Sequence, residues 1–392
     1  MSLLAVTFAV LRMPGDTSDL GLVLAARTVP QLVVLLGGGV LADRIGRRIV
    51  MLAADCLRCA AQGAFALTLA LGGRQIWLFM IFSAAVGAGE GLFGPSLSAL
   101  TVDITDPAEL GNANALCSLA ASAARILGPA LAGILIAAVS PWIVLAADAA
   151  SYAASVLALA CLRLPSRNAA AQSAARTSAI GDFREGWREF RAHRWLTPTT
   201  LQFTFINMLV WGPFMVVGPL LASRSSAGAA GWGLVMAGYG AGSVAGGLLA
   251  LGRRPRHPML ASVAATIGYG LPCAAIALAA PLTADLVAAV AAGAGSAVSA
   301  AFANTALQQR VPLSHLARVR SIQSLAAFSA GPVGLALAAP AALALGPARV
   351  LAFSAVWSTG AAVAVMALPS VRSLAWLRAP DPQREAVCAD PG

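Results

Sequence analysis

Eleven apolar runs of about twenty residues or more follow one another along the chain, separated by short polar breaks. A helix needs about 20 apolar residues to cross the roughly 30 Å hydrocarbon core of a bilayer. Each run is therefore long enough for one membrane crossing, and the pattern predicts an all-α membrane protein. The runs cover approximately residues 20–42, 49–72, 76–99, 113–139, 141–163, 198–222, 232–252, 258–280, 282–307, 322–345 and 347–368.

The balance of charged and apolar residues excludes an ordinary soluble domain. Of the 392 residues, 59% are hydrophobic and only 11% are charged, whereas a soluble protein carries roughly a quarter of charged residues. We therefore expect the lipid bilayer to be the solvent of this chain. Its net charge of +10 could indicate a nucleic-acid partner, but in a membrane protein an excess of basic residues is typical of cytoplasmic loops. We expect no nucleic-acid partner.

The basic residues alternate between loops, which predicts the orientation. Every second loop is rich in arginine, and the intervening loops hold mostly single charges. The positive-inside rule then places the rich loops and the C-terminus in the cytoplasm of a multi-pass cell-membrane protein. The rich loops contain Arg44, Arg47 and Arg48; the seven arginines from Arg163 to Arg194; Arg253, Arg254 and Arg256; Arg310, Arg318 and Arg320; and Arg372, Arg378 and Arg384.

The longest polar segment divides the chain into two six-helix bundles. We predict an N-terminal bundle over 1–163, a cytoplasmic linker over 164–197, a C-terminal bundle over 198–368 and a cytoplasmic tail over 369–392. In the linker, three aromatic residues alternate with arginines in the pattern of a basic amphipathic helix on an anionic membrane surface. The aromatic residues are Phe183, Trp187 and Phe190.

A short apolar fragment, Leu3–Leu11, precedes the first complete run. It covers about 13 Å as a helix, which is under half of the hydrocarbon core. We interpret it as the outer half of a truncated first helix and hypothesise that the natural start lies upstream of Met1. A degraded transporter is the alternative.

The loop after the first complete run carries the motif that indicates a family. It reads Gly39-Val-Leu-Ala-Asp43-Arg44-Ile-Gly46-Arg47-Arg48. This sequence resembles the signature loop G-x-L-A-D-R-x-G-R-(K/R) of the major facilitator superfamily, whose members are transporters with two pseudo-symmetric six-helix bundles. The resemblance implies that Asp43 contacts the N-terminal end of a facing helix near Ser321 and holds the cytoplasmic side shut, since the helix dipole favours an anion there.

The motif residues also suggest physical roles of their own. Gly39 lets two helices approach closely, and Gly46 permits a tight turn. Arg44 or Arg47 is expected to pair with Asp103 at the end of the fourth helix.

Further resemblances point to one branch of the superfamily. Gly128-Pro129 and Gly133 in the fifth helix resemble the G-P-x-x-G-G motif of exporters, although Ala132 replaces one glycine; helix packing is the alternative explanation. The R-x-x-Q-G pattern of drug–proton antiporters is missing, because Ser83 and Val86 occupy its places. Other segments resemble the branch of the enterobactin exporter and the macrolide efflux proteins, which implies export. These segments are Asp55–Arg58, Leu110–Asn114, Gln308–Pro312 and Arg318–Ser321.

Ionisable side chains within the apolar runs are candidates for proton coupling, because an unpaired charge in a membrane is costly. Glu90 and Arg125 lie at similar depth and could meet, either as a structural salt bridge or as a proton carrier with its counter-charge. Asp148 and Asp55 are the reserve carriers. Asp55 is three residues from Arg58, so these two can pair within one helix. Arg27 is expected to extend its side chain towards the membrane surface.

Amides and aromatic rings supply the candidates for a substrate cavity. Gln202, Asn207 and Trp211 recur at helical spacing, and Phe302 and Asn304 lie in the tenth helix. The resemblance implies that helices one, four, seven and ten line the cavity, and such a lining suits a bulky amphipathic ligand. Ordinary helix packing remains the alternative for each residue.

No pattern indicates an enzyme, a cofactor or a metal site. The chain has no Lys, and therefore no phosphate-binding Gly-Lys-Ser/Thr loop. Cys56 and Cys59 have C-x-x-C spacing but no second ligand pair. We predict a monomeric secondary active exporter of a siderophore, antibiotic, secondary metabolite or drug, working by proton antiport. An importer or facilitator of a small nutrient, and a non-transporting sensor on the same scaffold, are the alternatives.

Overall fold

The computed structural model describes residues 1–12, 18–104, 110–162, 179–225 and 228–375, and these form helices with no β-strand among them. Within these residues, nine helices are long and apolar enough to cross a membrane. The predicted all-α class is confirmed, because each predicted apolar run coincides with a helix or with consecutive helices. The run predicted over 322–345 differs most, since its helix begins at Leu313 and includes Arg318 and Arg320, which were expected in a loop.

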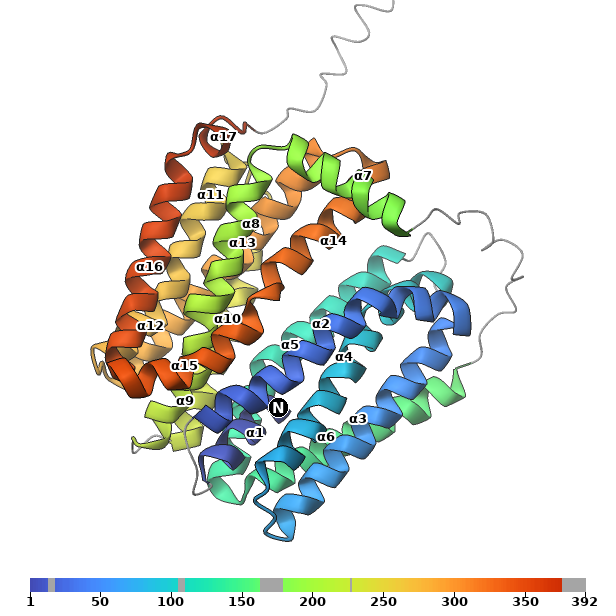
Figure 1. Cartoon of the computed structure of the whole chain (residues 1–392), viewed down its shortest axis with the longest axis vertical. Coiled ribbons are helices and arrows are strands. Elements are labelled where there is room, and N and C mark those ends of the chain that lie inside the picture. Colours follow the sequence, from blue (N-terminus) through green and yellow to red (C-terminus); the bar gives the residue numbers. More distant parts are fainter. Residues whose placement is uncertain (13–17, 105–109, 163–178, 226–227, 376–392) are drawn as a thin grey trace, which may run out of the picture.

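The first half of the chain forms one group of helices (Figure 1). The helix α4 lies between α2 and α3, and α3 packs against α6. The short α1 packs against α5 and α6, so the predicted apolar fragment is a helix that joins this bundle. The bounds are α1 Ser2–Leu11, α2 Ser18–Ile45, α3 Arg47–Ala70, α4 Ile76–Ile104, α5 Leu110–Ala138 and α6 Pro141–Cys161.

The second half forms another group, in which several predicted runs are interrupted. A π-helical turn separates α8 from α9, and a 3-10 turn separates α11 from α12. Neither interruption follows from hydropathy. The bounds are α8 Leu196–Ile206, η2 Asn207–Trp211, α9 Gly212–Ser223, α10 Gly228–Ala250, α11 Pro258–Ala265, η3 Thr266–Gly270, α12 Leu271–Ala277, α13 Leu282–Arg310, α14 Leu313–Ser329, α15 Gly331–Leu345, α16 Pro347–Ala367 and α17 Pro369–Arg372.

The two groups contact each other mainly through α5 with α10 and α2 with α15. Glycines make these contacts close: a Cβ on Gly133 would lie 2.8 Å from the carbonyl oxygen of Ala229, and a Cβ on Gly21 would overlap the carbonyl oxygen of Leu335. These contacts lie away from the end that carries α7, Ala179–Ala192 (Figure 1). We call the α7 end the linker end and the other the distal end.

The linker helix α7 packs on the second bundle. Glu185 accepts hydrogen bonds from His315 Nε2 at 2.9 Å and from Arg318 Nη1 at 2.6 Å, both on α14. Phe190 is buried in an apolar cluster with residues of α14, while Trp187 is 44% exposed. The predicted amphipathic helix exists, but the Phe190 side of it faces protein rather than a membrane surface.

Candidate functional site

Small residues of α4 bring α2 into close contact at the level of the intramembrane charges. A Cβ on Gly87 would overlap the carbonyl oxygen of Arg27, and a Cβ on Gly91 would lie 2.5 Å from that of Gln31. Because glycines four residues apart lie on one face of a helix, this face of α4 approaches the α2 backbone. The approach places the Arg27 side chain beside Glu90.

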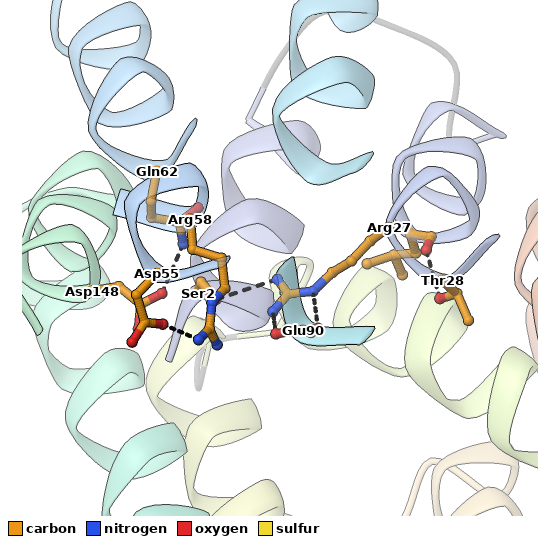
Figure 2. A network of polar contacts seen from close by, with 9 residues as sticks. Ser2, Arg27, Thr28, Asp55, Arg58, Gln62, Glu90 and Asp148 are labelled. Carbon is orange, nitrogen blue, oxygen red and sulfur yellow. Dashed lines mark hydrogen bonds and ion pairs between the residues drawn. The ribbon is translucent and has the colours of Figure 1, made fainter. Parts of the chain in front are cut away.

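Arg27 and Glu90 form a two-point ion pair between α2 and α4 (Figure 2). Arg27 Nε donates to Glu90 Oε2 at 3.3 Å, Nη2 donates to Oε1, and Nη1 donates to Ser2 Oγ at 3.3 Å. The exposed fractions of the two side chains are 13% for Arg27 and 25% for Glu90. The prediction that Arg27 extends towards the membrane surface is wrong, because the carboxylate of Glu90 supplies a partner inside the bundle. The side chain of Arg125, the partner expected for Glu90, lies outside the described residues.

Asp55 and Arg58 form a second, more deeply buried pair on α3, as their spacing predicts. Ser155 Oγ donates to Asp55 Oδ2 at 2.6 Å. The Arg58 guanidinium lies over the rings of Phe93, at 4.4 Å from the ring centroid, and Tyr152, at 4.5 Å. These contacts come from α3, α4 and α6, so the pair fastens three helices together.

The two pairs are neighbours across α4. Gly89 precedes Glu90, and a Cβ on Gly89 would lie 2.6 Å from Arg58 Cγ. Asp148 of α6 completes the polar layer by accepting a hydrogen bond from Gln62 Nε2 at 2.9 Å (Figure 2). Of the two carboxylates held by arginine, Glu90 is partly open whereas Asp55 is closed, with a side chain only 1% exposed.

The residues of the signature motif are partly described, and they lie in helices rather than in a loop, because α2 runs to Ile45 and α3 begins at Arg47. Gly46 has a φ of +103°, which a glycine tolerates at no steric cost. Arg48 donates from Nε to the carbonyl oxygen of Leu159 at 2.8 Å and from Nη2 to that of Ala160 at 2.6 Å, at the end of α6. The side chains of Asp43, Arg44 and Asp103, and the surroundings of Gly39, lie outside the described residues. The gate contacts expected for Asp43 and for Asp103 with Arg44 or Arg47 stay a prediction.

A polar pocket of about 220 Å³ lies inside the second bundle, between α8, α11, η3, α13 and α14. Gln202 and Asn304, two predicted cavity residues, line it. Gln202 Nε2 donates to Thr266 Oγ1 at 2.9 Å, and Tyr269 Oη donates to Ser296 Oγ at 2.9 Å.

Two further lining residues leave polar groups for a ligand. Thr200 Oγ1 is buried without a hydrogen-bond partner in the part of the chain that the structure describes. Arg320 is the one charged side chain among the residues that line the pocket, and it is exposed.

The other three predicted cavity residues do not line this pocket. Asn207 begins the π-helical turn, and its Nδ2 donates to the carbonyl oxygens of Phe203 at 2.9 Å and Ala327 at 3.2 Å. The Trp211 ring packs against Tyr239, and Phe302 is buried. A role for these three residues in a substrate cavity stays a prediction.

The Gly-Pro segment of α5 lies near the contact between the bundles. Pro129 is inside α5, and a Cβ on Gly233 of α10 would lie 2.7 Å from the Pro129 carbonyl oxygen and 3.0 Å from Gly133 Cα. Gly133 therefore permits backbone contact between the two halves. Gly128 lies near the start of the chain. A Cβ on Gly128 would lie 3.7 Å from the Cγ atom of Met1.

Residues 2–335 match the family model described as the Major Facilitator Superfamily, which is most of the chain. The chain belongs to the Major Facilitator Superfamily. As a member it is a membrane transporter with a small-molecule substrate. It is 26% identical over 387 residues to the multidrug efflux pump Tap of Mycolicibacterium fortuitum, covering 95% of this chain and 93% of the relative.

Solved structures agree with this superfamily fold. The nucleoside transporter NupG matches with a TM-score of 0.72 at 12% identity, covering 93% of this chain and 96% of NupG. A bacterial homologue of the human lysosomal transporter Spinster, in an inward-facing and occupied conformation, matches with a TM-score of 0.69 at 17% identity, covering 96% of each chain.

Sequence reasoning missed Arg27, Gln62 and Ser155 as partners of the intramembrane carboxylates. A usable signal existed for Arg27, because Gly87 and Gly91 are four residues apart and indicate a close helix contact beside Glu90. No comparable signal marks Gln62 or Ser155.

Proposed function

We propose that this transporter exports a small amphipathic molecule by proton antiport, with Glu90 as the proton carrier. The observation that carries the proposal is the Arg27–Glu90 ion pair, which is intramembrane, joins two helices and is partly exposed. Charged groups at membrane depth cost free energy to bury even when they are paired, so an intramembrane ion pair is a candidate functional site. An ion pair with a purely structural role is expected in a closed environment, such as that of Asp55 and Arg58.

The pair gives protonation a mechanical consequence. While Glu90 is ionised, Arg27 holds α2 against α4. A proton on the carboxylate removes the Coulomb attraction between the two side chains and so weakens the contact between α2 and α4 inside the first bundle. Deprotonation restores the pair. Asp148 and Asp55 are the reserve carriers.

The arrangement of the bundles supports an inward-facing state. They contact each other towards the distal end, and the alternation of arginine-rich loops favours the linker end and the C-terminus as cytoplasmic. Alternating access would then open the cytoplasmic side in this state. The Spinster homologue that this chain resembles is described as inward-facing. In this orientation the chain works in the cell membrane, and we expect it to be a monomer.

The polar pocket of the second bundle supports an amphipathic cargo. Gln202, Asn304 and Thr200 offer hydrogen bonds, and Phe203 and Tyr269 add aromatic surface. Ligand sites commonly combine apolar walls with a few convergent polar groups. Export, and cargo of the antibiotic, siderophore or drug class, are supported by likeness to a protein named as a multidrug efflux pump.

Inverted membrane vesicles test both the direction of transport and the proton gradient as its driving force. With an acidic interior imposed, a proton-driven exporter accumulates a fluorescent amphipathic dye such as ethidium inside the vesicle, and a protonophore abolishes the accumulation. Accumulation in right-side-out vesicles alone would indicate an importer. Saturable dye binding without flux in either orientation would indicate a sensor.

A further inference from the structure

A second pocket, of about 370 Å³, lies at the distal end of the second bundle, apart from Glu90 and from the polar pocket described above. It is formed by the last turns of α9, the first turns of α10, the end of α12 and the start of α13. Its walls are apolar, with Leu221, Val235 and Ile276 among them. Its volume falls within the range of small-molecule sites, about 300–1,000 Å³.

An aromatic ring forms a fixed wall of this distal pocket. Trp232 is 4% exposed and packs against Phe214, with 4.9 Å between the ring centroids. Gly218 leaves the space for this indole, because a Cβ there would overlap the ring. A rigid, well-packed tryptophan offers a surface for an apolar or cationic group at little entropic cost.

One charged side chain lines the distal pocket. Asp285 lies in the first turn of α13, and its Oδ1 is buried without a hydrogen-bond partner among the described residues. Asp285 is absent from the ion pairs found among the described residues. Asp285 is half-buried, so only its Oδ1 oxygen loses contact with solvent. The helix dipole favours an anion here only modestly, and the enclosed oxygen lacks a donor. A ligand that brings a positive charge would supply the missing partner.

We propose that the distal pocket binds a small organic cation, with its ammonium group at Asp285 and its apolar body against Trp232. Two sources share this chemistry: a free amphipathic amine, and the amine headgroup of a lipid in the adjacent leaflet. The site is independent of proton coupling, because no residue of the Arg27–Glu90 pair contributes to it.

Titration calorimetry on the purified full chain in detergent tests the site, with phenyltrimethylammonium as the probe and its uncharged isostere tert-butylbenzene as the ligand control. We expect saturable binding of the cation alone, weakened at least tenfold by Asp285→Asn. Asp19→Asn is the matched control, since Asp19 also lies in the first turn of a helix at the distal end but lines no such pocket. It should leave the affinity unchanged.

Ala222→Phe gives a second, charge-neutral test. Ala222 lines the distal pocket, and a phenyl ring there fills the space and should abolish binding while a monodisperse gel-filtration profile reports folding. Binding that survives both Asp285→Asn and Ala222→Phe, or that is lost with Glu90→Gln instead, overturns the proposal. In lipid nanodiscs, weaker probe binding with phosphatidylethanolamine than with an uncharged glycosyl diacylglycerol, which has neither an amine nor a net charge, identifies the headgroup as an occupant. Equal binding in both identifies a free amine.

Discussion

Arg58 is held by more groups than any other intramembrane charge described in the first bundle. It pairs with Asp55 and lies against two aromatic rings, and its side chain is 8% exposed. Arg58→Ala should therefore destabilise the protein by about 3–5 kcal/mol, because the buried carboxylate of Asp55 loses its counter-charge. Denaturant unfolding of the purified protein measures this loss. An unchanged unfolding midpoint would mean that Asp55 is not held as an anion by Arg58.

The sequence identified the charged side chains of the membrane-spanning helices but only some of their partners. The Asp55–Arg58 pair follows from helical spacing alone, since both residues lie on one face. The Arg27–Glu90 pair joins residues 63 positions apart, and their meeting depends on how closely α2 approaches α4 at Gly87. Hydropathy contains no information on that approach.

The docking of the linker helix α7 on the second bundle depends on the charge of Glu185. Hydrogen bonding from His315, and then the charge of Arg318, lower the pKa of Glu185 below its ordinary value of 4.5. A carboxyl whose pKa is lowered on docking supports docking above its ordinary pKa and stops doing so as the pH falls through the lowered value. We expect α7 to stay docked at neutral pH and to loosen below about pH 4.5.

Glu185→Gln should produce the same loosening at pH 7. Hydrogen–deuterium exchange over residues 184–192 should become faster than in the wild type, because the amide keeps hydrogen bonds but loses the charge. Glu189→Gln is the control, since the Glu189 carboxylate lies 3.8 Å from His193, the residue that follows α7, rather than against His315 or Arg318. Exchange as slow as in the wild type in Glu185→Gln would contradict this prediction and would leave apolar packing, such as that of Phe190, as the contact that holds α7.

Element boundaries were the most predictable part of the fold, and the interruptions within them were the least. The length of an apolar run is set by bilayer thickness, so α3, α6 and α16 begin and end within two residues of the predicted limits. The π-helical turn at Asn207 and the 3-10 turn at Thr266 lie inside continuous apolar runs, so the hydropathy of the sequence does not change where they occur. Their presence depends on packing between helices, which a single sequence does not display.

The contact between the bundles tests the state of the whole molecule. Gly233 packs on Gly133 with no room for a side chain, so Gly233→Leu should separate the bundles at the distal end and favour the opposite conformation. Spin labels at Leu71 and Leu278 report the change, because both residues are exposed, at 78% and 81%, in distal loops of different bundles. Pulsed electron resonance should give a longer distance in Gly233→Leu than in the wild type.

The matched control for that variant is Gly247→Leu, also in α10, where nothing lies within 4 Å of an added Cβ. It should leave the distance between the labels unchanged. A shorter or identical distance in Gly233→Leu would contradict the view that this glycine contact closes the distal end.

Reconstituted liposomes measure whether the flux of the cargo is coupled to the flux of protons. Ethidium flux is measured under an imposed pH gradient, and ethidium exchange is measured without a gradient, for wild type and Glu90→Gln. Glutamine keeps the shape of the side chain but binds no proton. If Glu90 carries the proton, Glu90→Gln should therefore lose gradient-driven ethidium flux and retain ethidium exchange. Undiminished gradient-driven flux in Glu90→Gln would contradict the proposal that Glu90 carries the proton and would assign proton coupling to another carboxylate.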